Sequence, residues 1–455
     1  MGLLAAHIND AGIAVLGDDR VLYREPGFAL LEDDGLVTGN AALAQSRLKP
    51  RRIHNHYWDQ LQTEPLADRR FSHLSAADLV SSQLQQIWQQ VAAHGDRLVV
   101  AVPPYMSSAN LGLFLGIADE LKVPVVAMVD AAVAATRREY QDAVPVHVDL
   151  SLHGAMLTRV LQQGRTQTER SEVVEGAGLL ALYDGWLRGI ADAFVLQSRF
   201  DPLHTADTEQ LLLNRMNGWL DAAATSDKVT LELEYRDITH TVELDSLELI
   251  AMAAPAYQRI VSSLRALFRA DETPALQLTD RAARMPGLAS LLGARVGGEV
   301  FLLEPGATAR GLLARCRDMQ RPAGGVSLIR QLPWDQAAVS LQQESVSTEG
   351  GRPTHLLHGN TAYVIDAAPL VLGSQPVADS RCIDLQQDMP GISRRHCSLM
   401  ARGGQCVIED HSRYGTFLNG HRIDGSAVLA LGDRLRIGTP GFELRLIELE
   451  GGHGT

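Results

Sequence analysis

Residues 390–420 read PGISRRHCSLMARGGQCVIEDHSRYGTFLNG, and this stretch decides how the C-terminal part of the chain is interpreted. Two polar loops alternate with apolar runs typical of β-strands. In the first loop, Ser393 and Arg394 offer charge-assisted donors to an oxyanion. Alone, this loop would read as a solvated turn, but a second loop with Ser412 and Arg413 follows at a fixed spacing. Neither loop pairs a nucleophile with a base, so the pattern predicts anion recognition and no catalytic residues.

The region from about residue 354 to 448 resembles a forkhead-associated domain, a β-sandwich that binds phosphothreonine peptides with loops at one end. The matching segments are Gly373-Ser374, Ser393-Arg394-Arg395-His396, Asp410 to Gly420 and Leu431 to Gly438. The resemblance implies a phosphopeptide site formed by Ser393, Arg394, Ser412, Arg413, Tyr414 and Asn419. It implies loop-shaping roles for Gly373, His396, Gly415 and Thr416.

Two positions depart from the family pattern. Ser374 stands where an arginine usually contacts the phosphate, and Tyr414 stands where an asparagine often holds the peptide backbone. Losing one charged hydrogen bond costs about 1.5–3 kcal/mol, which is roughly tenfold to a hundredfold in affinity. Arg413 is a candidate replacement because a guanidinium forks onto phosphate, and Arg381 is a weaker one. We expect ligand binding at this loop face, while its dependence on phosphothreonine stays open.

Composition and charge restrict the class of protein. The 455 residues are 45% hydrophobic and 21% charged, as in soluble globular proteins. There is no long apolar run, no basic leader and no Cys-x-x-Cys pair, so we expect a cytoplasmic protein without membrane insertion. The net charge is −13, and most of it lies before residue 354, which argues against nucleic-acid binding. Against that acidic background a basic cluster stands out, formed by Arg394, Arg395, Arg413 and Arg422.

The N-terminal two thirds alternate strand-like and helix-like patterns, which indicates an α/β domain. Prolines end one apolar run and a serine cap begins the helix after it. The expected elements are strands at 97–104, 123–129 and 146–150, helices at 108–121 and 131–138, and a hairpin of strands 229–235 and 238–244.

This order resembles the actin-like ATPase superfamily, which includes the heat-shock chaperone ATPases. The resemblance rests on segments 101–105, 129–135, 283–288 and 305–311. It implies a multidomain chain, with an actin-like (ribonuclease H-like) two-subdomain fold over residues 1–315, a linker at 316–352 and an all-β sandwich at 353–455.

The nucleotide chemistry of that superfamily is mostly missing. Backbone N–H groups must approach phosphates closely, which requires glycine-rich hairpins. The first phosphate loop survives only as Asp10-Ala11-Gly12, the second reads Asp149 to Gly154, and Thr279-Asp280 replaces an adenosine-binding Gly-Gly. We therefore expect a pseudo-ATPase without cofactor. If ATP and Mg²⁺ do bind, Asp10, Gly12 and Asp149 are the vestigial positions; otherwise these aspartates cap turns.

His54-Asn55-His56 has the alternating spacing of a strand that holds a metal. Residues 50–58 contain no third ligand, so the sequence predicts no metal site at this position.

The leading hypothesis is a non-catalytic adaptor of bacterial signalling or assembly complexes. Its sandwich docks a protein partner, phosphothreonine-containing or acidic, and its pseudo-ATPase part is a platform. One alternative is an active actin-like ATP-binding protein that the sandwich targets. Another is a structural subunit whose sandwich has lost its ligand. Self-association is a further partner prediction, because actin-like folds often self-associate.

Overall fold

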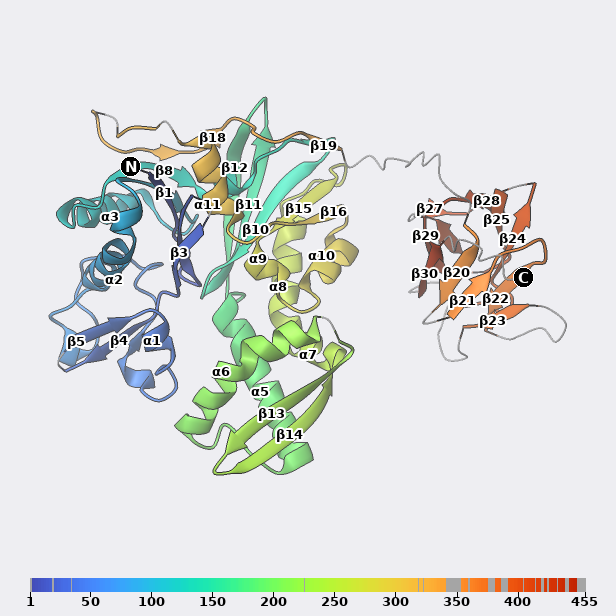
Figure 1. The fold of residues 1–455 in the computed structure, drawn as a ribbon, viewed down its shortest axis with the longest axis horizontal. Helices are drawn as coiled ribbons and strands as arrows, with labels where there is room; N and C mark the ends of the chain where they lie inside the picture. The colour runs from blue at the N-terminus through green and yellow to red at the C-terminus, as the bar shows by residue number, and fades with distance from the viewer. Residues whose placement is uncertain are drawn as a thin grey trace. The chain divides into compact units, whose positions relative to one another are not determined.

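The computed structural model divides the chain into two compact units, Met1–Gln342 and Gln343–Thr455 (Figure 1). Each unit is described by itself. The described residues are 2–18, 20–33, 35–224, 226–317, 319–321, 323–340, 353–358, 361–374, 381–385, 392–403, 405–413, 415–418, 421–423, 425–431, 433–437 and 442–447.

The first lobe of the first unit is built on a six-stranded sheet with the order β17-β8-β7-β1-β2-β3. The strands β1 to β3 form an antiparallel meander, and β7 and β8 continue the sheet parallel to β1. Helices α2 and α3 bury their apolar sides in the same core as these strands. The bounds are β1 (Leu3–His7), β2 (Ile13–Gly17), β3 (Arg20–Glu25), β7 (Arg97–Val102), β8 (Val125–Asp130), β17 (Leu328–Ile329), α2 (Ala76–Val91) and α3 (Ser108–Glu120).

The second lobe repeats this arrangement. Its sheet has the order β16-β15-β10-β11-β12-β18, again with an antiparallel meander followed by two parallel strands. The bounds are β10 (Val144–Leu150), β11 (Gly154–Gln162), β12 (Thr166–Glu175), β15 (Pro274–Leu278), β16 (Glu299–Leu302) and β18 (Gln331–Leu332). The expected α/β class and the strands at 97, 123 and 146 are thus confirmed, as is the helix from residue 108.

Each lobe carries an insertion between its meander and its parallel strands. The first insertion contains β4 (Ala29–Glu32), β5 (Gly35–Thr38), α1 (Asn40–Leu43) and β6 (Ile53–His54). The second contains α5 (Leu179–Ser198), α6 (Ala206–Ala223), β13 (Lys228–Tyr235), β14 (Ile238–Asp245), α7 (Ser246–Met252) and α8 (Ala254–Ala266). The antiparallel pair β13–β14 confirms the predicted hairpin.

The helix after β8 is shorter than predicted. It is α4 (Ala131–Ala135), and the Asp130 carboxylate caps it by accepting from two backbone N–H groups at 2.9 and 3.3 Å. Its last carbonyls accept from Arg315, at the end of α11 (Ala307–Arg315). A side chain of the neighbouring helix α11, which packs on the same sheet, therefore satisfies the helix end, so the helix does not continue to residue 138. The remaining short elements of this unit are β9 (Tyr140–Gln141), α9 (Asp280–Ala283), α10 (Leu288–Val296) and β19 (Val339–Ser340).

The predicted linker at 316–352 begins too early, because its first part belongs to the first unit. Strand β17 extends the first sheet, β18 extends the second and β19 pairs with β9. An ion pair between Arg137 and Asp335 at 2.5 Å ties the same segment down. Each of these strands is only two residues long, which is too short for a periodic sequence pattern to predict.

The second unit is a β-sandwich. A six-stranded sheet, β21-β20-β30-β29-β26-β27, and a five-stranded sheet, β23-β22-β24-β25-β28, enclose one apolar core. The bounds are β20 (His355–His358), β21 (Thr361–Val364), β22 (Leu370–Gly373), β23 (Cys382–Asp384), β24 (Cys397–Arg402), β25 (Gln405–Asp410), β26 (Thr416–Leu418), β27 (His421–Arg422), β28 (Ser426–Leu429), β29 (Arg434–Ile437) and β30 (Phe442–Ile447).

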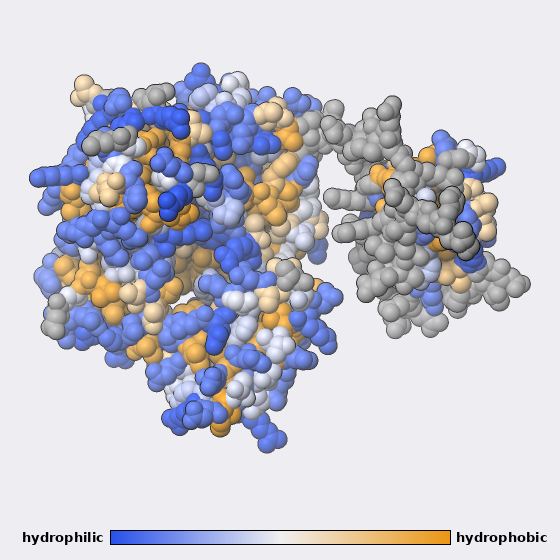
Figure 2. Space-filling model, in the orientation of Figure 1, coloured by the Kyte–Doolittle hydropathy of each residue, from blue (hydrophilic) through white to orange (hydrophobic). Residues whose placement is uncertain are grey.

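Among the helices in the described ranges, none is long and apolar enough to cross a bilayer. On the face of the first unit in Figure 2, hydrophobic residues form separate patches among hydrophilic ones. Large exposed apolar side chains include Leu196, Ile238 and Leu247, all in the insertion of the second lobe.

Candidate functional site

Two neighbouring loops of the sandwich carry the predicted recognition residues. The first loop precedes β24, and the second joins β25 to β26. The backbones meet directly, because the N–H of His411 donates to the carbonyl of His396 at 2.8 Å. The structure therefore places the two sequence motifs at one end of one sheet.

A buried histidine holds the two loops together. The Nδ1 atom of His396 accepts from the backbone N–H of Ser393 at 3.1 Å. Its Nε2 donates to the carbonyl of Gly415, also at 3.1 Å. This pairing requires the neutral ring with its proton on Nε2, and burial, which lowers the pKa of His396, favours the neutral form. The geometry agrees with the bracing role that the resemblance implied.

The hydroxyl of Ser393 is oriented from the second loop. Its Oγ accepts a hydrogen bond from the backbone N–H of Arg413 at 3.1 Å. Because a hydroxyl also carries one donor hydrogen, that hydrogen remains available to a ligand.

The second loop is shaped by an aspartate at its start. Asp410 Oδ1 accepts from the N–H of Ser412 at 3.0 Å and from the hydroxyl of Thr416 at 2.8 Å. Burial alone would raise the pKa of Asp410, but these hydrogen bonds outweigh it and lower the pKa. Ser412 Oγ accepts from the N–H of Gly415 at 2.7 Å, so this hydroxyl is used inside the turn. Gly415 has φ of +93°, and a Cβ there would lie 2.8 Å from the Nε atom of Arg422.

The end of β22 comes very close to the first loop. A Cβ on Gly373 would lie 2.0 Å from the carbonyl oxygen of Arg394, so only glycine fits. The next residue, Ser374, donates its N–H to the carbonyl of Ser393 at 3.2 Å. Ser374 therefore adjoins the candidate phosphate position, with a short side chain where the family pattern has an arginine.

Three arginines of the loops, Arg394, Arg395 and Arg413, are exposed and form no ion pair with another described residue. Arg381, the weaker substitute in the prediction, is used elsewhere, since it pairs with Asp366 at 2.5 Å and donates to the carbonyl of Val364. Two predicted contact residues, Tyr414 and Asn419, lie outside the described residues.

Comparison with known families agrees with this geometry. Residues 370–438 match the family model of the FHA domain. No curated protein matches the chain. The match covers part of the sandwich, from β22 to the end of β29, and no residue of the first unit. An FHA domain is a protein-interaction module that binds phosphopeptides, so a protein partner is supported.

A second candidate site is the cleft between the two lobes of the first unit. Its cavity is about 620 Å³, and residues from both lobes line it, among them Gly12, Arg24, Tyr183, Asp280, Arg281 and Arg284. The loops at Asp10 and Asp149, which the sequence analysis predicts to be vestigial phosphate loops, meet beside it. Asp10 Oδ1 accepts from the N–H of Leu152 at 2.8 Å, across the two lobes.

An arginine that sequence analysis missed joins these two loops. Arg281 donates to Asp149 Oδ1 at 3.0 Å, to the Leu150 carbonyl at 3.0 Å and to the Gly12 carbonyl at 3.3 Å. A Cβ on Gly12 would lie 3.1 Å from the same guanidinium. The signal was present in the sequence, since Arg281 directly follows the Thr279-Asp280 pair that stands where the nucleotide pattern requires glycines.

Asp149 is charged and satisfied within the protein. Burial alone would raise its pKa, but Arg281, His7, His147 and a hydrogen bond from Thr279 lower it to about 2. Burial lowers the pKa of His7 to about 4, so Arg281 is the main counter-charge at neutral pH. Asp149 also accepts from Asn9 at 2.8 Å. Its oxygens are therefore occupied by protein donors.

Asp10 is in the opposite situation. Burial raises its pKa to about 7, and its Oδ2 is buried without a hydrogen-bond partner among the described residues. A carboxyl group with this pKa is only about half ionised at neutral pH, which makes it a weaker ligand for Mg²⁺ than an ordinary aspartate.

Proposed function

We propose that this protein is a non-catalytic adaptor. Its FHA sandwich docks a phosphothreonine-containing protein partner, and its first unit is a platform of the actin-like type that has lost nucleotide chemistry. The observation that carries the proposal is the hydroxyl of Ser393, held by the Arg413 backbone beside exposed guanidinium groups.

The chemistry of the loops fits a phosphate group. The Ser393 hydroxyl supplies a donor, and Arg394 and Arg413 supply charge that no described carboxylate neutralises. Charge-assisted hydrogen bonds from guanidinium to phosphate are among the strongest that proteins form. The rigid brace through His396 fixes the loops before the ligand arrives, which lowers the entropic cost of binding.

The cleft supports the loss of nucleotide chemistry in the first unit. Arg281 occupies the space beside Gly12 and neutralises Asp149, where a metal and phosphates would have to bind. Two lobes of repeated topology are in keeping with the two-subdomain architecture that the actin-like resemblance implies. To act as a platform for partner proteins, the first unit then needs only a folded surface and no bound nucleotide.

Selection from a randomised peptide library tests the proposal. The full chain is incubated with phosphothreonine peptides and with their unphosphorylated counterparts, and bound peptides are sequenced. We expect phosphate-dependent enrichment that Arg394→Ala removes. Arg402→Ala is a matched control, because Arg402 is an exposed arginine at the far end of β24 from the loops. Equal or absent enrichment from both libraries would favour the structural subunit with a ligand-dead sandwich.

One observation favours the second candidate, an ATP-binding protein. The cleft volume of about 620 Å³ lies within the range of small-molecule sites. Saturable binding of ATP to the full chain, abolished by a bulky substitution such as Gly12→Trp, would establish it.

A further inference from the structure

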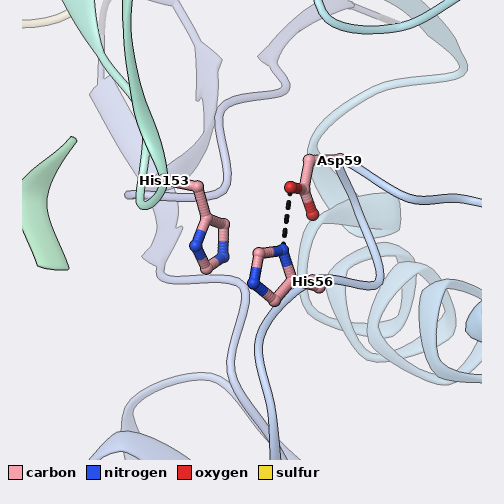
Figure 3. A group of neighbouring side chains, drawn as sticks. All are labelled: His56, Asp59 and His153. Carbon is pink, nitrogen blue, oxygen red and sulfur yellow. Dashed lines mark hydrogen bonds and ion pairs between the residues drawn. The ribbon is translucent and has the colours of Figure 1, made fainter. Parts of the chain in front are cut away.

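Three potential metal ligands from distant parts of the sequence meet in the first unit. They are His56, Asp59 and His153, and one ligand atom from each lies within 4.8 Å of the other two (Figure 3). The first two follow β6 in the first lobe, while His153 lies in the β10–β11 turn of the second lobe. The prediction of no third ligand near His56 was wrong, because it stopped one residue before Asp59 and could not place a side chain nearly a hundred residues away.

The local backbone fixes the turn that carries His153. The turn that carries His153 is closed by hydrogen bonds between Ser151 and Gly154. The N–H of Ser151 donates to the carbonyl of Gly154 at 2.8 Å, and the N–H of Gly154 donates to the hydroxyl of Ser151 at 3.0 Å. The His153 ring stacks on the His56 ring, with centroids 3.5 Å apart and planes 16° from parallel. The cluster is thus formed by two fixed segments, one from each lobe.

One carboxylate oxygen of Asp59 is available to bind a metal ion. Its Oδ2 lies 2.9 Å from His56 Nδ1, whereas its Oδ1 is buried and has no hydrogen-bond partner among the described residues. A buried carboxylate oxygen without a partner is costly, and a cation is one way to satisfy it.

We propose that His56, Asp59 and His153 bind one divalent transition-metal ion, for which zinc is the best fit. Two imidazoles and one carboxylate are a common zinc donor set, leaving a fourth position for water. Ligand atoms around a tetrahedral zinc lie about 3.4 Å apart, given bonds of about 2.1 Å. His56 Nδ1 and Asp59 Oδ2 are 2.9 Å apart, already within this separation. Because the two rings are stacked, their nitrogen lone pairs lie in nearly parallel planes, so binding of one ion requires rotation of the His153 side chain. The Nε2 atom of His153 now lies 3.0 Å from the Asn55 carbonyl.

A bound ion would connect the segment after β6 to the β10–β11 turn, and therefore the first lobe to the second. The expected consequence is a first unit that unfolds at higher temperature when the metal is present, because a ligand that binds only the folded state stabilises it. All five tryptophans lie in residues 1–342, so tryptophan fluorescence follows this unit alone.

Titration of the chelator-stripped full chain with Zn²⁺ against a chromophoric competitor tests the proposal. We expect one ion per chain, with affinity at least about tenfold weaker in His56→Gln and His153→Gln. His54→Gln is the matched control, since His54 is two residues from His56 and outside the cluster. Zn²⁺ should raise the unfolding temperature of the wild-type chain and of His54→Gln, but not of His153→Gln.

The charge-removing variant Asp59→Asn keeps the size of the side chain and provides a second test if a histidine variant fails to fold. It should also weaken Zn²⁺ binding. Absence of saturable binding, or binding of equal strength in the cluster variants and the His54→Gln control, would overturn the proposal. In that case the stacked histidines serve only to pack the two segments.

Discussion

The interlobe cleft and the loop end of the FHA sandwich both place arginines beside glycine-containing turns, but they use the charge in opposite ways. In the cleft each lining arginine has a carboxylate partner: Arg24 with Asp280 at 2.8 Å, Arg47 with Asp184 at 3.0 Å, Arg281 with Asp149 at 3.0 Å and Arg284 with Asp221 at 2.6 Å. In the sandwich, Arg394, Arg395 and Arg413 are exposed and have no such partner within the described part of the chain. Neutralised charge stabilises a fold, whereas unpaired charge remains available to a ligand.

The largest expected effect comes from breaking the internal pair of the cleft. Arg281→Ala leaves the buried Asp149 charge uncompensated, so we expect the free energy of unfolding of the first unit to fall by about 3–5 kcal/mol. Urea unfolding followed by tryptophan fluorescence measures it.

Arg284→Ala is the control for that variant. The Arg284–Asp221 side chains are 58% and 50% exposed, against 12% and 2% for Arg281–Asp149. Loss of an exposed pair costs about 0–1 kcal/mol. Equal effects of the two variants would show that Arg281 does not stabilise the junction of the two loops.

The second largest expected effect is a pH-dependent change in the free energy of unfolding, and it comes from Asp10. Its folded pKa, about 7, lies above its unfolded value, so its contribution to stability is lost as pH rises through 7. Asp10→Asn keeps an acceptor for the N–H of Leu152 and cannot ionise. We expect it to stabilise the first unit by about 2–3 kcal/mol more at pH 8 than at pH 5. Urea titrations at both pH values test this, and a pH-independent difference would contradict it.

The third prediction concerns the sandwich. Arg394→Ala should weaken binding of a selected phosphothreonine peptide roughly tenfold to a hundredfold, the cost of about 1.5–3 kcal/mol for one charged hydrogen bond. Fluorescence anisotropy with a labelled peptide measures the affinity, and Arg402→Ala should leave it unchanged. An Arg394→Ala affinity equal to that of the wild type would remove this residue from the site.

The fourth prediction is a gain of affinity for the phosphothreonine peptide when an arginine replaces Ser374. Ser374 adjoins Ser393 through a backbone hydrogen bond of 3.2 Å and stands where the family pattern has an arginine. Ser374→Arg adds a guanidinium at the phosphate position, so we expect up to about tenfold tighter binding. The same substitution should not change binding of the unphosphorylated peptide. Equal tightening for both peptides would indicate a general charge effect.

The sequence predicted the sandwich loops better than the cleft, for a physical reason. The recognition residues lie within about thirty positions of one another, and local turn chemistry at Gly415 and Thr416 determines their geometry. The strands at 97, 123 and 146 could also be predicted from the sequence, because buried parallel strands are continuous apolar runs. The pairing of Arg281 with Asp149 joins residues 132 positions apart in the sequence, and the approach of His153 to His56 crosses the two lobes. No local pattern records either contact. The role of Ser412 in its own turn likewise depends on a hydrogen bond to Gly415 that the sequence pattern does not predict.

The central claim is that ligand recognition belongs to the sandwich loops and not to the cleft. Calorimetric titration of one preparation of the full chain, first with a selected phosphothreonine peptide and then with ATP and Mg²⁺, tests it most directly. We expect saturable binding of the phosphorylated peptide, loss of that binding when the peptide is dephosphorylated, and no heat of binding for ATP. Stoichiometric ATP binding, together with no preference for the phosphorylated peptide, would contradict it.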